Sequence, residues 1–365
     1  MNSRVVAALA VLVAVVTGCT TATSPSSQPS PSQTATQAPS PSSSGSAATS
    51  PPAPTPSPSA PGPIELTVMT YNTLTGKNDC AGCAALRAAG LGDELKLGAR
   101  MPVVAEKVRL ADPDLIGFQE NTGASPLPQL HLAGLLPDYT WVNPDATEPI
   151  AVRKARFAVV ESGQEVLEQK ALSCTKRDRT DGRFVSWALL RELASGRELW
   201  VFNTHLHPYD LAACADLRAE NLARLAALVE VKNPDGKLPQ LVLGDFNAYG
   251  DETRQRFSSH LTTLAELGMV DTALVAEQDD SDVPGAASAG WMTARVKGQL
   301  EPKVVRTTGR HIDYIWVPRG TRVASWAVLS GPGVEYRRLR GVKVPVWTGV
   351  LGSDHSPVIA RFSLA

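Results

Sequence analysis

The stretch LVLGDFNA (residues 241–248) places an acid and an amide directly after a short apolar run. Such a run is typical of a buried strand, so Asp245 and Asn247 are predicted to lie where that strand ends. They are two positions apart, and on extended backbone their side chains point to the same side. A carboxylate beside an amide can bind and orient a water molecule or a metal ion. An Asx turn followed by a helix is the alternative interpretation.

Other strand-like runs along the chain also lead into, or carry, polar residues. These residues are Asn72 after 64–69, Glu120 after 114–118, His205 after 199–202, Asp313 within 312–317, and the triplet Ser353-Asp354-His355 before 358–362. A carboxylate at the end of a buried strand is costly unless it is paired or binds a metal. For Glu120 alone, an ordinary acid at a surface strand end is the competing interpretation.

Asp313 is an acid inside an apolar strand, and such a carboxylate favours a cationic partner. His355 is the natural candidate. Their pairing would orient the imidazole and raise its pKa, so that a protonated ring can face a phosphate. His205 and His207 add two further imidazoles, although a lone histidine is more often structural.

The order of elements indicates an α/β protein. Helix-like stretches cover 84–110, with breaks expected at Gly90 and Pro102, and 211–231. The stretches 148–160 and 184–206 are typical of meandering strands, with a turn at 194–197. Alternating strands and helices at this length predict sheets inside and helices outside.

Taken together, these pieces resemble the endonuclease/exonuclease/phosphatase superfamily, whose fold is that of deoxyribonuclease I. The matching pieces stand in family order across residues 65–363: Tyr71-Asn72, Gln119-Glu120, Asn203-Thr204-His205, Gly244-Asp245-Phe246-Asn247, Ile312-Asp313-Tyr314 and Ser353-Asp354-His355. The resemblance implies a four-layer α/β/β/α sandwich. Its two mixed, mainly antiparallel sheets would pack face to face, with the site where both open at one end.

The resemblance also implies a divalent-metal site. Glu120 would be the principal ligand of Mg²⁺, for which Mn²⁺ can substitute. Asn72 would lie beside it as a metal residue, and Asp354 would be a second contact. Carboxylate and amide oxygens are the ligands that a hard cation prefers.

The same resemblance implies catalytic roles for five residues. Asp245 would orient or deprotonate the attacking water, and Asn247 would position it. His205 and His355 would contact phosphate oxygens, and Asp313 would hold His355. Attack would be in line, without a covalent enzyme intermediate.

Two arginines are weaker candidates for phosphate binding. Arg153 and Arg183 lie in stretches that resemble those where family members present a basic residue near the scissile phosphate. Solvated strand charges are the alternative for both.

The N-terminal segment differs in composition from the rest of the chain. A basic head at Arg4 precedes an apolar run over residues 5–16, and Cys19 then follows small residues. This pattern resembles the lipobox of bacterial lipoproteins and predicts a signal peptide over 1–19. An ordinary secretory signal or a short anchor is the alternative. Residues 20–63 carry no charge and are rich in Ser, Thr and Pro, which predicts a disordered linker.

The predicted domain therefore spans 64–365, outside the cytoplasm and anchored to the membrane as a lipoprotein, or secreted. An even number of cysteines in an exported domain favours disulfides. We expect the pairs Cys80–Cys83 and Cys174–Cys214. A zinc site is the rival for the first pair, but no second Cys or His pair stands at zinc spacing.

The net charge of the domain bears on the kind of substrate that it can bind. The chain has 35 basic and 36 acidic residues, and among them only Arg4 precedes residue 64, so the domain has a formal charge of −2. The leading prediction is a nuclease-like phosphodiesterase. A phosphatase or phospholipase-C-type enzyme acting on small or lipid phosphoesters is the alternative, and a catalytically dead binding module is a third. The sequence predicts no obligate protein partner.

Overall fold

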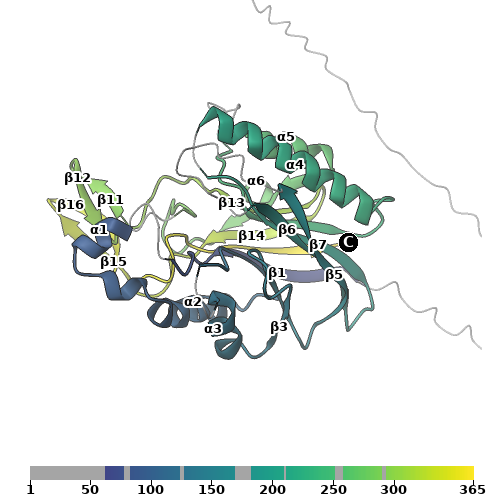
Figure 1. The fold of residues 1–365 in the computed structure, drawn as a ribbon, viewed down its shortest axis with the longest axis horizontal. Helices are drawn as coiled ribbons and strands as arrows, with labels where there is room; N and C mark the ends of the chain where they lie inside the picture. The colour runs from purple at the N-terminus through teal and green to yellow at the C-terminus, as the bar shows by residue number, and fades with distance from the viewer. Residues whose placement is uncertain are drawn as a thin grey trace, which may run out of the picture. The chain divides into compact units, whose positions relative to one another are not determined.

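The structure is a computed structural model that describes residues 62–77, 83–123, 127–168, 182–208, 211–250, 258–289 and 293–365. Two large sheets and the helices around them make up most of these residues (Figure 1). Among the helices in these ranges, none combines the length and the apolar character needed to cross a bilayer. The predicted signal peptide, Cys19 and nearly all of the predicted linker lie outside the described residues.

The first large sheet has seven strands in the order β10-β14-β17-β1-β2-β4-β3. Their bounds are β1 Ile64–Asn72, β2 Leu115–Gln119, β3 Tyr139–Val142, β4 Ile150–Arg153, β10 Gln278–Asp279, β14 Arg322–Val328 and β17 Val358–Leu364. The central strand β1 is antiparallel to β17 and parallel to β2. Asn72 therefore pairs with Gln119, and both strands end at the same edge.

The second large sheet has six strands in the order β5-β6-β7-β8-β13-β9. Their bounds are β5 Phe157–Glu168, β6 Arg183–Glu192, β7 Glu198–His205, β8 Gln240–Asp245, β9 Met269–Asp271 and β13 Asp313–Pro318. Only β7 and β8 run parallel within this sheet. The prediction of two mixed, mainly antiparallel sheets is confirmed.

Three apolar clusters define the layers. The largest lies between the sheets and includes Val68 and Leu115 from one sheet and Leu243 and Ile315 from the other. A second cluster packs the outer face of the β8 sheet against α4 (Ala212–Lys232) and α5 (Ser259–Glu266). A third packs the outer face of the β1 sheet against α2 (Leu97–Ala111) and α3 (Pro128–Leu135). The order helix, sheet, sheet, helix is the four-layer sandwich that the sequence predicts.

The helical stretch predicted over 84–110 is divided, but not as expected. Its pieces are α1 Cys83–Ala88, the 3-10 helix η1 Gly92–Leu95, and α2. The break at Gly90 is confirmed, since this glycine has a φ of +78°. The break at Pro102 is wrong, because Pro102 lies inside α2. One further short helix, α6 Thr272–Val275, follows β9.

Two small hairpins lie beside α1 on the same side of the drawing (Figure 1). One consists of β11 Thr293–Val296 and β12 Gln299–Pro302, and the other of β15 Val334–Leu339 and β16 Val342–Trp347. A bridge between Val304 and Val346 joins them, and both residues belong to a small apolar cluster with Val296. These hairpins occupy loops in which the sequence showed no pattern.

Gly244 allows β7 and β8 to approach each other near the ends of both strands. A Cβ at this position would lie 2.1 Å from the backbone oxygen of Thr204, and its φ is +146°. Because the obstacle is backbone, we expect Gly244→Ala to lower the free energy of unfolding by at least about 3 kcal/mol. The matched control is Gly134→Ala in α3, where the added Cβ meets no atom within 4 Å. That variant is expected to gain up to about 1 kcal/mol. Urea unfolding measures both, and equal stabilities would contradict the argument.

Candidate active site

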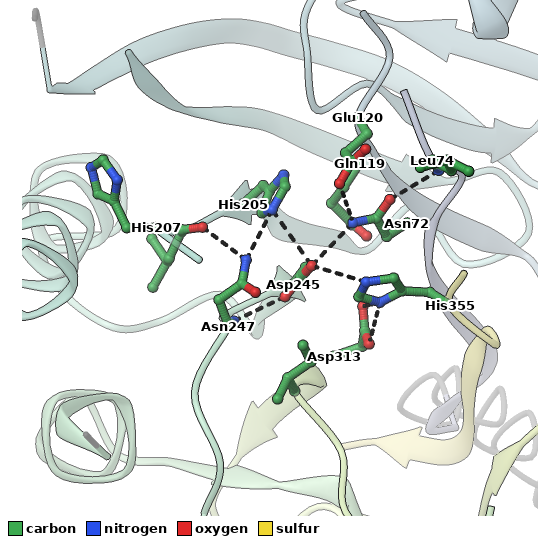
Figure 2. Close-up of polar contacts among 12 residues, drawn as sticks. Asn72, Leu74, Gln119, Glu120, His205, His207, Asp245, Asn247, Asp313 and His355 are labelled. Atoms are coloured by element: carbon green, nitrogen blue, oxygen red, sulfur yellow. Dashed lines mark hydrogen bonds and ion pairs between the residues drawn. The ribbon is translucent and has the colours of Figure 1, made fainter. Parts of the chain in front are cut away.

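The predicted polar residues come together where both sheets end (Figure 2). Asn72 closes β1, Asp245 closes β8, and His205 closes β7. Asp313 opens β13, which runs antiparallel to β8 and pairs Asp313 directly with Asp245. Strand direction and register thus bring residues that are far apart in the sequence into one cluster.

Asp313 holds His355, as the sequence predicts. The Asp313 Oδ2 atom lies 2.9 Å from His355 Nδ1, and Oδ1 lies 3.2 Å from it. The backbone N–H of His355 donates to Ser353 Oγ, which itself donates to the backbone oxygen of Asn72. The loop before β17 is therefore fastened to the end of β1, and the imidazole has a fixed orientation.

The charge state of His355 follows from its neighbours. Burial alone would lower its pKa, but the negative charges of Asp313 and Asp245 outweigh burial and raise that pKa well above the usual value. The Nε2 atom lies 3.7 Å from Asp245 Oδ2. His355 is therefore a cation at neutral pH, with one ring nitrogen directed at Asp245.

Asp245 occupies the centre of the cluster and is 1% exposed. It accepts hydrogen bonds from the Asn72 side-chain amide (3.0 Å) and from the backbone N–H of Asn247 (2.9 Å). Burial, with the charge of Asp313 added, raises its pKa to about 7. A carboxylate with this pKa can accept and release a proton near neutral pH.

His205 and Asn247 form the opposite wall. The Asn247 side-chain nitrogen lies 3.0 Å from His205 Nε2 and also donates to the backbone oxygen of Leu206. Asn247 has a φ of +50°, a conformation that asparagine tolerates better than most residues. Burial first, and then the charge of Arg183, lower the pKa of His205 well below its usual value. His205 is therefore neutral, in contrast to His355.

Glu120 directly follows β2 and has a φ of +64°. Its Oε1 accepts a hydrogen bond from the Asn72 amide at 3.0 Å, and its Oε2 accepts one from the backbone N–H of Thr75 at 2.7 Å. Asn72 thus donates to both Glu120 and Asp245, while its own Oδ1 accepts from Leu74. In this arrangement Asn72 orients two carboxylates, and its role as a metal residue stays a prediction.

The donors around Glu120 fit a hard divalent cation. Asp354 is close enough that the charge of Glu120 contributes to raising the pKa of Asp354, although burial is the larger cause and sets it at about 6. A buried acid such as Asp354 beside a second carboxylate is stabilised in its charged form by a nearby cation. Both offer only oxygen atoms, as Mg²⁺ or Mn²⁺ requires.

A second grouping, Asp245 with Asp313 and His355, also has ligand atoms within 4.8 Å of one another. We do not assign the cation there, because His355 Nδ1 is already bonded to Asp313 and the group includes a nitrogen donor. A hard divalent cation prefers oxygen ligands. The oxygen donors of Glu120 and Asp354 are the better match.

Buried polar residues fix the strand ends beneath the site. The Gln119 amide donates to Asn203 Oδ1 at 2.8 Å, and the Asn203 amide donates to the backbone oxygen of Phe118 at 2.7 Å. These bonds join β2 of one sheet to β7 of the other. Arg100, fully buried in α2, donates to backbone oxygens of Thr73 and Gly352. The site thus rests on a rigid base.

Arg153 is not brought to this site, which corrects its prediction as a phosphate-binding residue. β4 runs antiparallel to β2, so Arg153 lies beside Asp114, at the opposite end of β2 from Glu120. Its side chain bonds to Asp112, the backbone oxygen of Pro113 and the hydroxyl of Tyr139. Antiparallel pairing of β4 with β2 places Arg153 away from the cluster.

Glu148, at the other end of that strand, was missed from the sequence. It is 3% exposed, and its carboxylate accepts a bond from the Thr147 hydroxyl. Burial raises its pKa to about 7, and the charges of Arg183 and Glu120 also act on it. Arg183, predicted near the phosphate, is buried at the start of β6 and affects both Glu148 and His205. An acid before proline at a strand start was too weak a signal to find Glu148.

His207 and the described cysteines do not contact the residues of the cluster in any bond that the structure shows. His207 is fully buried and lies 2.6 Å from Glu168, and it points away from Asp245 (Figure 2). This agrees with its expected peripheral role. Cys83 and Cys214 are also fully buried. Their predicted partners, Cys80 and Cys174, lie outside the described residues, so both pairings stay predictions.

Glu148 gives a testable dependence of stability on pH. Its pKa in the folded protein, about 7, lies above the ordinary value of 4.5, so folding favours the protonated form. Its contribution is complete below pH 4.5 and is lost as pH rises through 7. Glu148→Gln should remove this loss, which amounts to ~3 kcal/mol between pH 5 and 8.

Urea unfolding in EDTA across that range measures the effect of Glu148→Gln. The matched control is Glu165→Gln, an exposed position on β5, which should keep the wild-type pH dependence. If Glu148→Gln also keeps the wild-type dependence of stability on pH, Glu148 does not bind a proton on folding.

Comparison with known proteins decides the family. A model of the endonuclease/exonuclease/phosphatase family matches residues 69–355, which is most of the chain and every residue of the cluster. The chain belongs to the endonuclease/exonuclease/phosphatase family. No match was found in the search of curated proteins.

Solved structures show the same fold at low sequence identity. An endonuclease/exonuclease/phosphatase family protein from Bacteroides thetaiotaomicron has a TM-score of 0.58 at 20% identity, covering 83% of this chain and 99% of its own. The mannosyl-6-phosphatase Bt3783 of the same species has a TM-score of 0.57 at 21% identity, covering 81% and 99%. The human Nocturnin catalytic domain with bound sulfate has a TM-score of 0.51 at 19% identity, covering 82% and 94%. At these identities the likeness extends to the fold alone.

Proposed function

We propose that this family member is a divalent-metal-dependent hydrolase that cleaves phosphodiester bonds by in-line attack of water. The observation that carries the proposal is the position of Asp245. This carboxyl has a pKa of about 7, and it lies between a cationic His355 and the amides of Asn72 and Asn247. A general base near neutral pH beside a cation is what attack on a phosphoester requires.

The roles of the side chains follow from their charge states. Asp245 accepts the proton of the attacking water, and Asn247 orients that water. The cationic His355, held by Asp313, offsets charge that develops on the phosphoryl oxygens. The neutral His205 offers a hydrogen bond to phosphate from the opposite wall.

Glu120 and Asp354 would hold the cation, with Mg²⁺ or Mn²⁺ as the expected ion. When bound, it supplies positive charge to the phosphoryl oxygens. Asn72 keeps Glu120 and Asp245 a fixed distance apart through its two hydrogen bonds.

A panel of substrates tests the proposal. The purified protein is incubated with bis-p-nitrophenyl phosphate and p-nitrophenyl phosphate, each with Mg²⁺, Mn²⁺ or EDTA. We expect turnover of the diester with metal and none with EDTA. Turnover in EDTA would refute metal dependence. Turnover of the monoester alone would refute the preference for diesters. No turnover of either substrate would refute the proposal that the protein is an enzyme.

We further propose that the enzyme acts outside the cytoplasm, tethered through a lipid on Cys19 and the linker 20–63. The support is the segment 1–19 with its small residues before Cys19. Cys19→Ser is expected to move the protein from the membrane fraction to the soluble fraction. An unchanged distribution would exclude the lipid anchor.

A further inference from the structure

The hairpin of β15 and β16 has an exposed face with two cations and an aromatic ring. Arg338 stands directly opposite Lys343, and Tyr336 stands opposite Pro345. Residues directly opposite in an antiparallel pair project from the same face, and alternate residues of one strand share a face. Tyr336, Arg338 and Lys343 therefore lie on one face. Tyr336 is 53% exposed, and the Lys343 ammonium lies 4.9 Å from the centre of its ring.

This arrangement does not serve the stability of the hairpin. Like charges directly opposite each other destabilise an antiparallel pair. Leu339, Val344 and Val346 on the other face pack with Val296 and Val304, and Val334 and Trp347 at the base of the hairpin pack with the core between the sheets. Tyr336, Arg338 and Lys343 are left exposed on a hairpin that is packed on its other face and at its base.

Charge is concentrated on these hairpins. Residues 293–303 and 334–347 contain seven basic residues and two acidic ones, although the whole domain is slightly acidic. Both acids are already paired, Glu335 with Arg337 and Glu301 with Arg340. Within the described part of the chain, neither Arg338 nor Lys343 has an acidic partner within 4.0 Å. Their charges are available to an anion from outside.

The hairpin is coupled to the catalytic loop. Asp354 lies seven positions after Trp347, the last residue of β16, so the two lie within about 25 Å of each other. Three bonds fix the connecting segment: Lys303 Nζ donates to the backbone oxygen of Gly349, Arg100 donates to that of Gly352, and Thr348 N–H donates to that of Gly333. An extended polymer bound at the hairpin can thus reach the site.

We propose that the Tyr336, Arg338 and Lys343 face binds a single strand of nucleic acid outside the active site. The two cations would contact phosphates, and the tyrosine ring would stack on a base, the combination used by single-strand binding surfaces. The inference rests on the proposed function for its link to catalysis, because the strand would then enter the Asp245 cluster. A membrane surface fits less well, since insertion needs a broad apolar face and the apolar side of this hairpin is packed.

Binding is measured without turnover, by fluorescence anisotropy of a fluorescein-labelled 20-nucleotide single strand in EDTA. We expect the double variant R338A/K343A to weaken binding about tenfold or more. It should also reduce the slope of log Kd against log salt by about 1.4, or 0.7 for each lost phosphate contact. Tyr336→Ala should weaken binding at least about fivefold, and Tyr336→Phe should keep the wild-type affinity.

The matched control is R191A/K237A, which removes two exposed basic residues outside the hairpins. It should leave affinity and salt slope within about twofold of the wild type. Equal affinity of the wild type and R338A/K343A would overturn the inference. Binding to phosphatidylserine vesicles but not to the oligonucleotide would also overturn it, in favour of a membrane surface.

Activity separates this inference from the proposed function. Bis-p-nitrophenyl phosphate lacks the strand that the hairpin face would bind, so R338A/K343A should hydrolyse it at the wild-type rate. If the wild type does not hydrolyse it, the proposed function fails, and the anisotropy result still decides the binding face. If the wild type hydrolyses it and R338A/K343A does not, the hairpin also supports the catalytic loop, and the affinities measured in EDTA decide the binding face.

Discussion

Replacing Glu120 by Gln is expected to lower kcat/KM for bis-p-nitrophenyl phosphate at least about 1000-fold, which corresponds to ~4 kcal/mol of transition-state stabilisation. The substitution keeps the shape of the side chain, and the amide oxygen of Gln can still accept a hydrogen bond from the Asn72 side chain or from the Thr75 backbone N–H. It removes the negative charge on which cation binding depends. Loss of activity should therefore come with weaker metal affinity and little loss of stability.

Three measurements examine Glu120→Gln together: steady-state kinetics over a range of Mg²⁺ and Mn²⁺ concentrations, metal titration calorimetry, and urea unfolding in EDTA. The matched control is Glu106→Gln, the same change at an exposed position of α2. It should keep both activity and metal affinity. If Glu120→Gln keeps wild-type metal affinity, the cation lies elsewhere, and the group of Asp245, Asp313 and His355 becomes the alternative.

The fold was predictable from sequence because its signals are local. Asp245 and Asp313 each adjoin an apolar strand, and polar residues at strand ends gather where the ends of a sandwich meet. Their direct pairing in β8 and β13 follows from that geometry. The six ordered pieces then selected one family among the α/β folds.

The errors arose where the answer depends on strand direction or on long-range contacts. Arg153 was assigned to the site because its stretch resembles one that presents a basic residue in the family, but antiparallel pairing with β2 places it at the opposite end of the sheet. The same reversal brings Glu148 toward the site. Pro102 was expected to end a helix, yet packing of Met101, Val104 and Val108 in the outer cluster maintains α2 around it. Tertiary packing overrode the local preference.

The hairpin of β15 and β16 could not be recognised because its meaning depends on cross-strand pairing. The near-neutral net charge of the whole domain gives no sign of a cationic surface. Pairing places Lys343 opposite Arg338 and beside Tyr336, so three scattered residues become one surface. Net charge averages over such a surface and does not reveal it.

The pair of Asp313 and His355 should behave as one unit. We expect Asp313→Asn and His355→Gln each to lower kcat/KM by about 100- to 10,000-fold, and the double variant to lose little more. The reason is geometric: Asp313 contacts the far nitrogen of the imidazole and acts through it, so once His355 is gone Asp313 has little left to contribute. Additive losses in the double variant would contradict this coupling.

The dependence on pH distinguishes positioning from a merely structural role. The charge of Asp313 helps to raise the pKa of His355, so Asp313→Asn should lower that pKa toward its usual value. The imidazole would then lose its proton within the neutral range, and the variant should lose more activity at pH 8 than at pH 6. Proton NMR of the histidine ring measures the pKa directly, with His131→Gln, on α3, to assist assignment.

Because the charge of Asp313 also raises the pKa of Asp245, removing it should let Asp245 ionise at lower pH. The rising limb of the rate profile should therefore move to lower pH while the falling limb appears near neutrality, a paired shift that general loss of structure would not produce.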